Sequence, residues 1–137
     1  MHINLESDYA IRIVQCLAEQ SSRTHTSETD APFLTARAIA TATGVSSSFT
    51  LKILRKLVAE GIAVSYKGAG GGYELARPAA SITLRQVIEA AEGPYQFSRC
   101  LSGTYDCNCP PDTCRFYAVF NEVSQLVSEK LDTVKFG

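Results

Sequence analysis

Four of the five cysteines in this chain of 137 residues could do chemistry together, because they lie within fifteen residues: Cys100, Cys107, Cys109 and Cys114. The chain begins without a basic stretch followed by an apolar run, so we expect no secretory signal and a cytoplasmic protein. Disulfides are rare in a reducing cytoplasm, and clustered thiols there indicate metal binding or redox chemistry.

The spacing Cys-x6-Cys-x-Cys-x4-Cys lacks the Cys-x2-Cys pairs of most structural zinc sites. Thiolates along an irregular loop are typical of an iron–sulfur cluster, [2Fe–2S] or [4Fe–4S]. Zinc, a thiol redox switch and inert cysteines are the alternatives. We expect the evenly spaced Cys100, Cys107 and Cys114 to be the ligands, with Cys109 as an alternative, because Cys107 and Cys109 are too close to share a cluster easily. The remaining cysteine, Cys16, reads as a small apolar residue of a helix.

The charge is concentrated in the middle of the chain, although the formal net charge is only −1. Residues 37–85 carry seven basic and two acidic side chains, whereas residues 1–36 and 86–137 are both acidic overall. A basic segment between acidic flanks is expected where one part of a protein faces phosphate.

Two short helices are predicted within this basic segment. Thr35 can cap a helix that ends near Gly44, and Ser46 or Ser47 can cap a second helix that runs to Glu60. This is the helix-turn-helix pattern, in which the second helix reads DNA. We expect its hydroxyls to meet base edges or phosphates and its cations to meet the backbone, which gives the set Ser46, Ser47, Ser48, Thr50, Lys52, Arg55 and Lys56.

A β-hairpin is predicted directly after these helices. Residues 62–65 and 72–75 have strand character, and the glycines between them permit an exposed turn. Such a hairpin is a wing, and Lys67 at its tip could reach phosphate or the minor groove. The glycine-rich stretch does not indicate a nucleotide phosphate loop, because no helix start and no Walker lysine follow it.

Three further helices complete the prediction. Residues 7–19 form the first, with Ser7 as its cap and Asp8 in its first turn, and Thr83 caps another that ends at Gly93. From Asp112 to Val134, apolar residues recur every three or four positions. A small domain offers little surface that could cover so apolar a helix face. We therefore expect this helix to pack against a second copy of the chain and form a homodimer.

The expected fold is therefore mainly α with a small β-hairpin wing: a winged helix-turn-helix plus a long C-terminal dimerisation helix. Residues 1–80 would form the DNA-binding domain, and residues 81–137 the cysteine-containing sensor loop and dimerisation helix. No apolar run is long enough to span a membrane. No catalytic triad or carboxylate pair is evident, so we expect no enzyme.

The order of these segments resembles one bacterial family. The stretches SDYAIRIVQCLAE, TARAIATATGVSSSFTLKILRKLVAEGIAVS, YKGAGGGYELARP and ITLRQVIEAAEG, followed by the cysteine loop, are similar to the winged-helix regulators that include IscR, NsrR and CymR. The resemblance covers nearly the whole chain, and its most specific part is the wing from Lys67 to Leu75.

This resemblance implies a homodimeric transcription factor, in many members with an iron–sulfur cluster held by three loop cysteines. In some members the partner's first helix supplies an acidic ligand, at the position of Asp8 here. The cysteine spacing is wider than usual, no histidine follows Cys114 closely, and Tyr66-Lys67 stands where arginine is common. Lysine keeps a phosphate contact but loses the fork that reads guanine.

The expected function is that of a DNA-binding regulator, most simply a repressor, that senses redox state, nitric oxide or iron–sulfur status. The alternatives are a winged-helix regulator with a zinc or thiol-switch loop, and a protein-docking module without a cluster. The sequence indicates a double-stranded DNA operator and a second copy as partners. It gives no indication of a contact with RNA polymerase.

Overall fold

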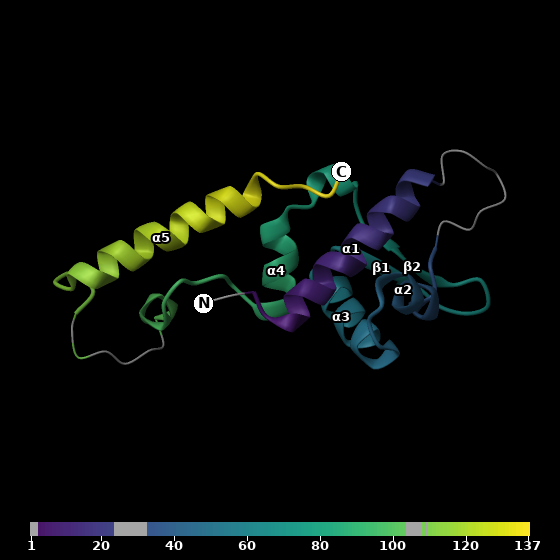
Figure 1. Cartoon of the computed structure of the whole chain (residues 1–137), viewed down its shortest axis with the longest axis horizontal. Coiled ribbons are helices and arrows are strands. Elements are labelled where there is room, and N and C mark those ends of the chain that lie inside the picture. The colour runs from purple at the N-terminus through teal and green to yellow at the C-terminus, as the bar shows by residue number, and fades with distance from the viewer. Residues whose placement is uncertain (1–2, 24–32, 104–107, 109) are drawn as a thin grey trace.

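The computed structural model describes residues 3–23, 33–103, 108 and 110–137. Its elements, in chain order, are α1 (Leu5–Arg23), α2 (Ala36–Thr43), α3 (Ser47–Ala59), β1 (Ala63–Tyr66), β2 (Gly72–Leu75), the 3₁₀ helix η1 (Ala79–Ser81), α4 (Leu84–Glu92), the 3₁₀ helix η2 (Arg99–Ser102) and α5 (Arg115–Asp132). This arrangement confirms the expected winged helix-turn-helix with a long C-terminal helix (Figure 1).

Helix α1 lies at the centre of the molecule and contacts α2, α3, α4 and β2. Its apolar residues recur every three or four positions, so that one face is buried from Ser7 to Ala18. The core is a single apolar cluster drawn from both sides of residue 80, and its largest members are Ile13, Leu17, Ile39, Ile53, Leu54, Leu57, Ile62, Ile82 and Val87.

The beginning of α1 differs from the prediction. Ser7 was expected to cap the helix, but it is fully buried inside the first turn. The side chain of Asn4 takes the capping role, because its Oδ1 accepts the backbone N–H of Ser7 at 3.0 Å. Asn and Ser are both good caps, and the helix therefore begins earlier than expected.

Helices α2 and α3 form where their caps predict. The Thr35 side chain accepts the N–H of Ala38, and Gly44 ends α2 with a φ of 72°. Of the two candidate caps for α3, Ser46 is the one used, and its Oγ accepts the N–H of Phe49.

The wing is a two-stranded antiparallel hairpin in which Ala63 pairs with Leu75 and Tyr66 with Gly72. Leu34, just before α2, exchanges two backbone hydrogen bonds with Tyr73 and extends the sheet by one bridge. A Cβ atom on Gly72 would lie 2.6 Å from the carbonyl oxygen of Leu34, so this close approach requires glycine. The wing is thereby anchored to the segment that enters the helix-turn-helix.

Helix α4 begins at the predicted cap Thr83, which forms a capping box with Gln86: each side chain accepts the other residue's backbone N–H. Helix α5 extends away from the α1–α4 bundle (Figure 1). Helix α5 ends at Asp132, so the expectation that the helix includes Val134 is wrong. The backbone carbonyl of Val134 instead accepts the N–H of Leu84, and Phe136 packs on the core. Among the described helices, none is long and apolar enough to cross a bilayer.

Candidate nucleic-acid interface and cysteine segment

Helix α3 has one buried and one exposed face. Thr50, Ile53, Leu54 and Leu57 point into the core. The opposite side, called the outer face below, consists of the exposed residues Ser47, Ser48, Lys52 and Arg55. Most hydroxyl and basic side chains expected to meet DNA therefore lie on one surface.

Two of the hydroxyls expected to contact DNA are placed differently: one caps a helix and the other is buried. Ser46 is exposed, but its Oγ caps α3. The expectation that Thr50 offers its hydroxyl to DNA is wrong, because its side chain is completely buried. The 3.6-residue period of the helix places Thr50 with Leu54 and Leu57 rather than with Ser48. Half-buried Leu51, which the sequence analysis did not single out, lies one turn from Ser47, Ser48 and Arg55.

The two lysines of α3 have an intramolecular partner that the sequence analysis missed. Lys52 Nζ lies 2.6 Å from Oε1 of Glu6 on α1, and Lys56 Nζ bonds the other oxygen, Oε2. These two hydrogen bonds lower the pKa of the Glu6 carboxyl below its ordinary value, and the bond from Lys52 has the larger effect. No local signal reveals the pairs, because the partners are 46 and 50 residues apart.

Arg55 and Lys67 differ from these lysines. Both are exposed, and neither is in an ion pair with another described residue. Lys67 lies at the tip of the wing, as predicted. At the turn end of β1 the Tyr66 ring packs on Phe33 with centroids 4.2 Å apart, and the Tyr66 hydroxyl donates to Glu74 at 2.7 Å. These contacts fix the strand that presents Lys67.

An aromatic pair borders the outer face where α1 meets α3. Tyr9 packs edge-on against Phe49 with ring centroids 5.5 Å apart. The Lys52 ammonium group lies 5.8 Å from the centroid of the Phe49 ring. Phe49 and Glu6 therefore flank Lys52 from two sides, and both interactions hold its side chain near α1.

The cysteine segment is described at its two ends. Cys100 in η2 is half-buried and its thiol donates to the Ser98 hydroxyl at 3.2 Å, and Cys114 is half-buried directly before α5. Cys107 and Cys109 lie outside the described residues. Thiol donors at both ends of one segment are the right chemistry for an iron–sulfur cluster. In the part of the chain that is described, no three candidate ligands come together.

Asp8 lies in the first turn of α1, as predicted. Its carboxylate is 47% exposed and pairs with Arg12 one turn later, with Nη2 and Oδ2 2.9 Å apart. The structure does not group Asp8 with both Cys100 and Cys114. Within one copy Asp8 is thus an exposed carboxylate near the end of a helix, which leaves it accessible to a second copy.

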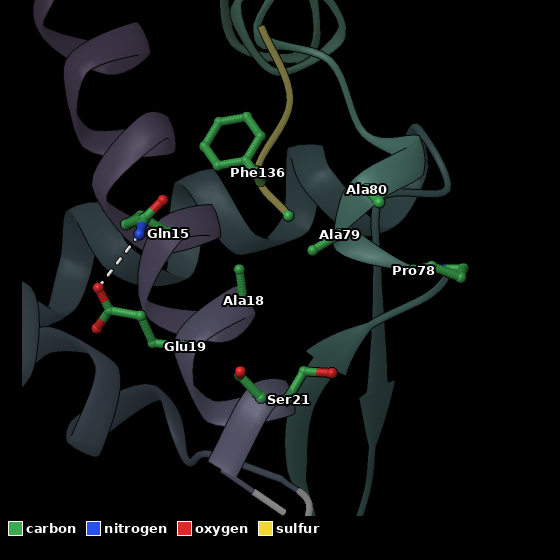
Figure 2. A pocket seen from close by; sticks show the side chains of 10 residues that line it. Gln15, Ala18, Glu19, Ser21, Pro78, Ala79, Ala80 and Phe136 are labelled. Atoms are coloured by element: carbon green, nitrogen blue, oxygen red, sulfur yellow. Dashed lines mark hydrogen bonds between the residues drawn. The ribbon is translucent and has the colours of Figure 1, made fainter.

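A separate pocket of about 420 Å³ lies between the second half of α1, η1 and the tail that follows α5 (Figure 2). Gln15 donates to Glu19 at 3.2 Å along its wall, and Phe136 lies at its side. Its lining includes no residue of α3, of the wing or of the cysteine segment. The pocket is therefore not part of the candidate interface.

The chain is similar to known proteins over most of its length. It is 30% identical over 133 residues to Protein aau3 of Rhizobium meliloti, which covers 96% of this chain and 79% of that protein. It is 30% identical over 94 residues to the HTH-type transcriptional regulator IscR of Klebsiella pneumoniae, which covers 69% of this chain. The match spans only about half, 56%, of the length of that IscR.

The fold is shared with a solved structure, CymR, described as the global cysteine regulator of B. subtilis. The TM-score is 0.71 at 20% identity, and the match covers 99% of this chain and 93% of CymR. A family model described as Rrf2, an iron-dependent transcriptional regulator, matches residues 3–137. Its members are transcriptional regulators and not enzymes, which confirms the expectation that this chain is not an enzyme. The chain belongs to the Rrf2 family of transcriptional regulators.

Proposed function

We propose that this chain is a homodimeric cytoplasmic repressor that binds a double-stranded DNA operator through α3 and the wing. The observation that carries the proposal is the outer face of α3, where Ser47, Ser48 and Arg55 are exposed, together with the exposed Lys67 at the wing tip. Residues 1–80 supply this surface, and residues 81–137 supply the sensor segment and the dimer contact.

The residues of α3 have different roles in this proposal. The N-terminal end of a recognition helix meets base edges, so Ser47 and Ser48 offer hydroxyls there, with Ser46 behind them as the cap. Arg55, two turns further on, and Lys67 meet backbone phosphates. Lys52 and Lys56 add positive charge that Glu6 partly neutralises.

Helix α5 supports the homodimer. Phe116, Val119 and Leu126, called the α5 stripe below, are more than half exposed at spacings of three and seven residues. That spacing places them along one side of the helix, which α4 and η2 leave uncovered. A second copy on this side buries the stripe and places two α3 helices on successive half-sites of an operator.

The cysteine segment supports an iron–sulfur cluster, held by Cys100, Cys107 and Cys114 with Cys109 as the alternative ligand. Asp8 of the second copy is the remaining ligand in this proposal, as the family resemblance implies, and its carboxylate is 47% exposed in the single copy. A bound cluster would supply redox and nitric oxide reactivity. The segment connects α4 to α5 in the chain, so a cluster bound there would bear on the dimer contact. Zinc is the alternative occupant.

The DNA-binding part is tested by fluorescence anisotropy with a labelled duplex of random sequence, at salt concentrations between 50 and 200 mM. Binding that weakens steeply with salt is the expected result. Lys67→Ala weakens it uniformly across sequences and lowers the salt dependence by about one phosphate contact. Negligible affinity at low salt contradicts the proposal and favours the protein-docking module.

The cluster is tested on protein purified without oxygen. We expect broad visible absorption together with bound iron and sulfide, and bleaching on reduction or exposure to nitric oxide. A colourless protein without iron after reconstitution contradicts the cluster. Zinc analysis then distinguishes a zinc site from a thiol switch.

A further inference from the structure

Glu6 contacts the helix proposed to read DNA without belonging to the helix-turn-helix. Its two carboxylate oxygens divide between the two lysines of α3, Oε1 to Lys52 at 2.6 Å and Oε2 to Lys56. The Glu6 side chain is only 24% exposed, so it sits between the two helices rather than in open solvent. Both ammonium groups are therefore already paired with negatively charged oxygens, the kind of group that a DNA phosphate also offers.

The two lysines are held to different extents. Lys56 also donates to the backbone carbonyl of Ala91 at 2.9 Å, so its ammonium group is fixed between α1 and α4. The Lys52 side chain is 52% exposed and belongs to the outer face, and Glu6 is its ion-pair partner among the described residues. Lys52 is therefore the lysine that DNA can take from Glu6.

Whether Lys52 pairs with Glu6 or with a DNA phosphate can be measured from the salt dependence of DNA binding. A lysine that meets a phosphate releases one condensed counterion and adds about 0.9 to the slope of log K against log salt concentration. A lysine that stays on Glu6 adds nothing, because its charge is already neutralised. The number of phosphate contacts made by α3 therefore depends on Glu6.

We propose that Glu6 is an internal competitor for DNA phosphate, a positioning residue that holds Lys52 against α1 and so limits the affinity of α3 for the DNA backbone. This inference rests on the proposed DNA-binding function and adds to it. A regulator that binds all DNA tightly cannot select its operator, and restraint of a backbone-binding lysine lowers the sequence-independent part of the affinity.

The test is Glu6→Gln, which keeps the size of the side chain and removes its charge. With the labelled random duplex we expect about three- to eightfold tighter binding at 0.1 M salt and a salt slope steeper by about 0.9. The matched control is Glu19→Gln, which removes the same charge from the same helix at an exposed position bonded to Gln15. It leaves both values unchanged, whereas a general charge effect changes both variants equally and overturns the proposal.

Lys52→Gln completes a double-mutant cycle. Alone it weakens binding by less than the gain of Glu6→Gln, because Glu6 already neutralises part of the Lys52 charge, and in the Glu6→Gln background it weakens binding more and abolishes the gain. Lys52→Gln leaves the Glu6–Lys56–Ala91 contacts in place, so it tests the proposal even if Glu6→Gln folds poorly. A large loss of binding for Lys52→Gln alone overturns it.

The outcomes separate the two proposals. If the wild type binds the duplex and Glu6→Gln binds with the same Kd and slope, only the role of Glu6 is overturned. If neither protein binds at 50 mM salt, the DNA-binding function itself fails and the role of Glu6 fails with it. Thermal unfolding of each variant confirms that the compared proteins are folded.

Discussion

The ammonium group of Lys56 donates to the backbone carbonyl of Ala91 at 2.9 Å and joins α3 to the last turn of α4. A cation is favourable there, because the carbonyls at the end of a helix carry partial negative charge. The N–H of Asn4 donates to Glu92 at 2.9 Å in the same region. The start of α1, the last turn of α3 and the end of α4 therefore meet at one junction, from which the chain continues to Cys100.

This junction predicts that the two lysines of α3 differ in their effect on stability. Lys56→Met removes a charged hydrogen bond to a carbonyl and an ion pair, and we expect it to lower the free energy of unfolding by about 1–2 kcal/mol. Lys52→Met removes an exposed ion pair and costs about 0–1 kcal/mol. Urea unfolding measures both values, and a Lys52→Met cost equal to or above that of Lys56→Met contradicts the interpretation.

Glu6 predicts a pH dependence of stability. Hydrogen bonds from Lys52 and Lys56 lower its folded-state pKa below the ordinary value of 4.5. Its contribution is therefore complete above about pH 4.5 and is lost as the pH falls through the lower folded-state pKa. We expect Glu6→Gln to lower the Tm by about 2–4 °C at pH 7. This difference shrinks below pH 4.5 in thermal unfolding scans, and a difference that stays constant down to pH 3 contradicts the pairing.

Local signals predicted most of the fold. The caps Thr35, Ser46 and Thr83 act on N–H groups three residues away, so sequence alone reveals them. The same locality explains the error at the first helix, where Asn4 and Ser7 are both acceptable caps and only tertiary packing decides between them. The last helix was predicted to extend to Val134 because the apolar pattern continues that far. Val134 lies in the tail after α5, which contacts α4 but is no longer helical.

Contacts between distant residues could not be predicted. The Glu6 pairs join α1 to α3 across 46 and 50 residues, and Glu6 by itself reads only as an acidic residue in a first turn. The pairing of the outer-face residue Lys52 with Glu6 therefore emerged only with the tertiary structure. The burial of Thr50 is different, because the helical period alone places it with Leu54 and Leu57 on the buried face, so this error could have been avoided from the sequence.

The wing predicts a specific effect of Gly72→Ala. The added Cβ would meet the Leu34 carbonyl oxygen at 2.6 Å, so the bridge between Leu34 and Tyr73 must open. Overpacking of this kind costs about 1–3 kcal/mol. We expect that loss in urea unfolding, and weaker binding of the random duplex because the wing shifts. Ser65→Ala, at an exposed position of β1, is the control and stays within about 0.5 kcal/mol.

The cysteines predict a selective loss of bound iron. Cys100→Ser and Cys114→Ser each remove a proposed ligand, so we expect both to lose visible absorption, iron and sulfide after anaerobic purification. Cys16→Ser is the matched control, because burial and then Glu19 raise the pKa of the Cys16 thiol and disfavour the thiolate that binds metal. Equal loss of iron in Cys16→Ser contradicts the proposed ligand set.

The α5 stripe predicts how the homodimer can be broken. Leu126 is 59% exposed in the single copy, and its burial against a second copy contributes about 1.5–3 kcal/mol. Leu126→Glu replaces this with an unpaired charge in an apolar contact, so we expect a shift from dimer to monomer in light scattering at micromolar concentration. Gln125→Glu adds the same charge one position earlier, on the side of α5 that faces Arg85 and Tyr95, and should leave the dimer intact. Because a dimer reads two half-sites together, Leu126→Glu also weakens operator binding. Both variants keep the wild-type helical content, which shows that they are folded. A dimer that persists in Leu126→Glu places the contact between copies elsewhere on the molecule.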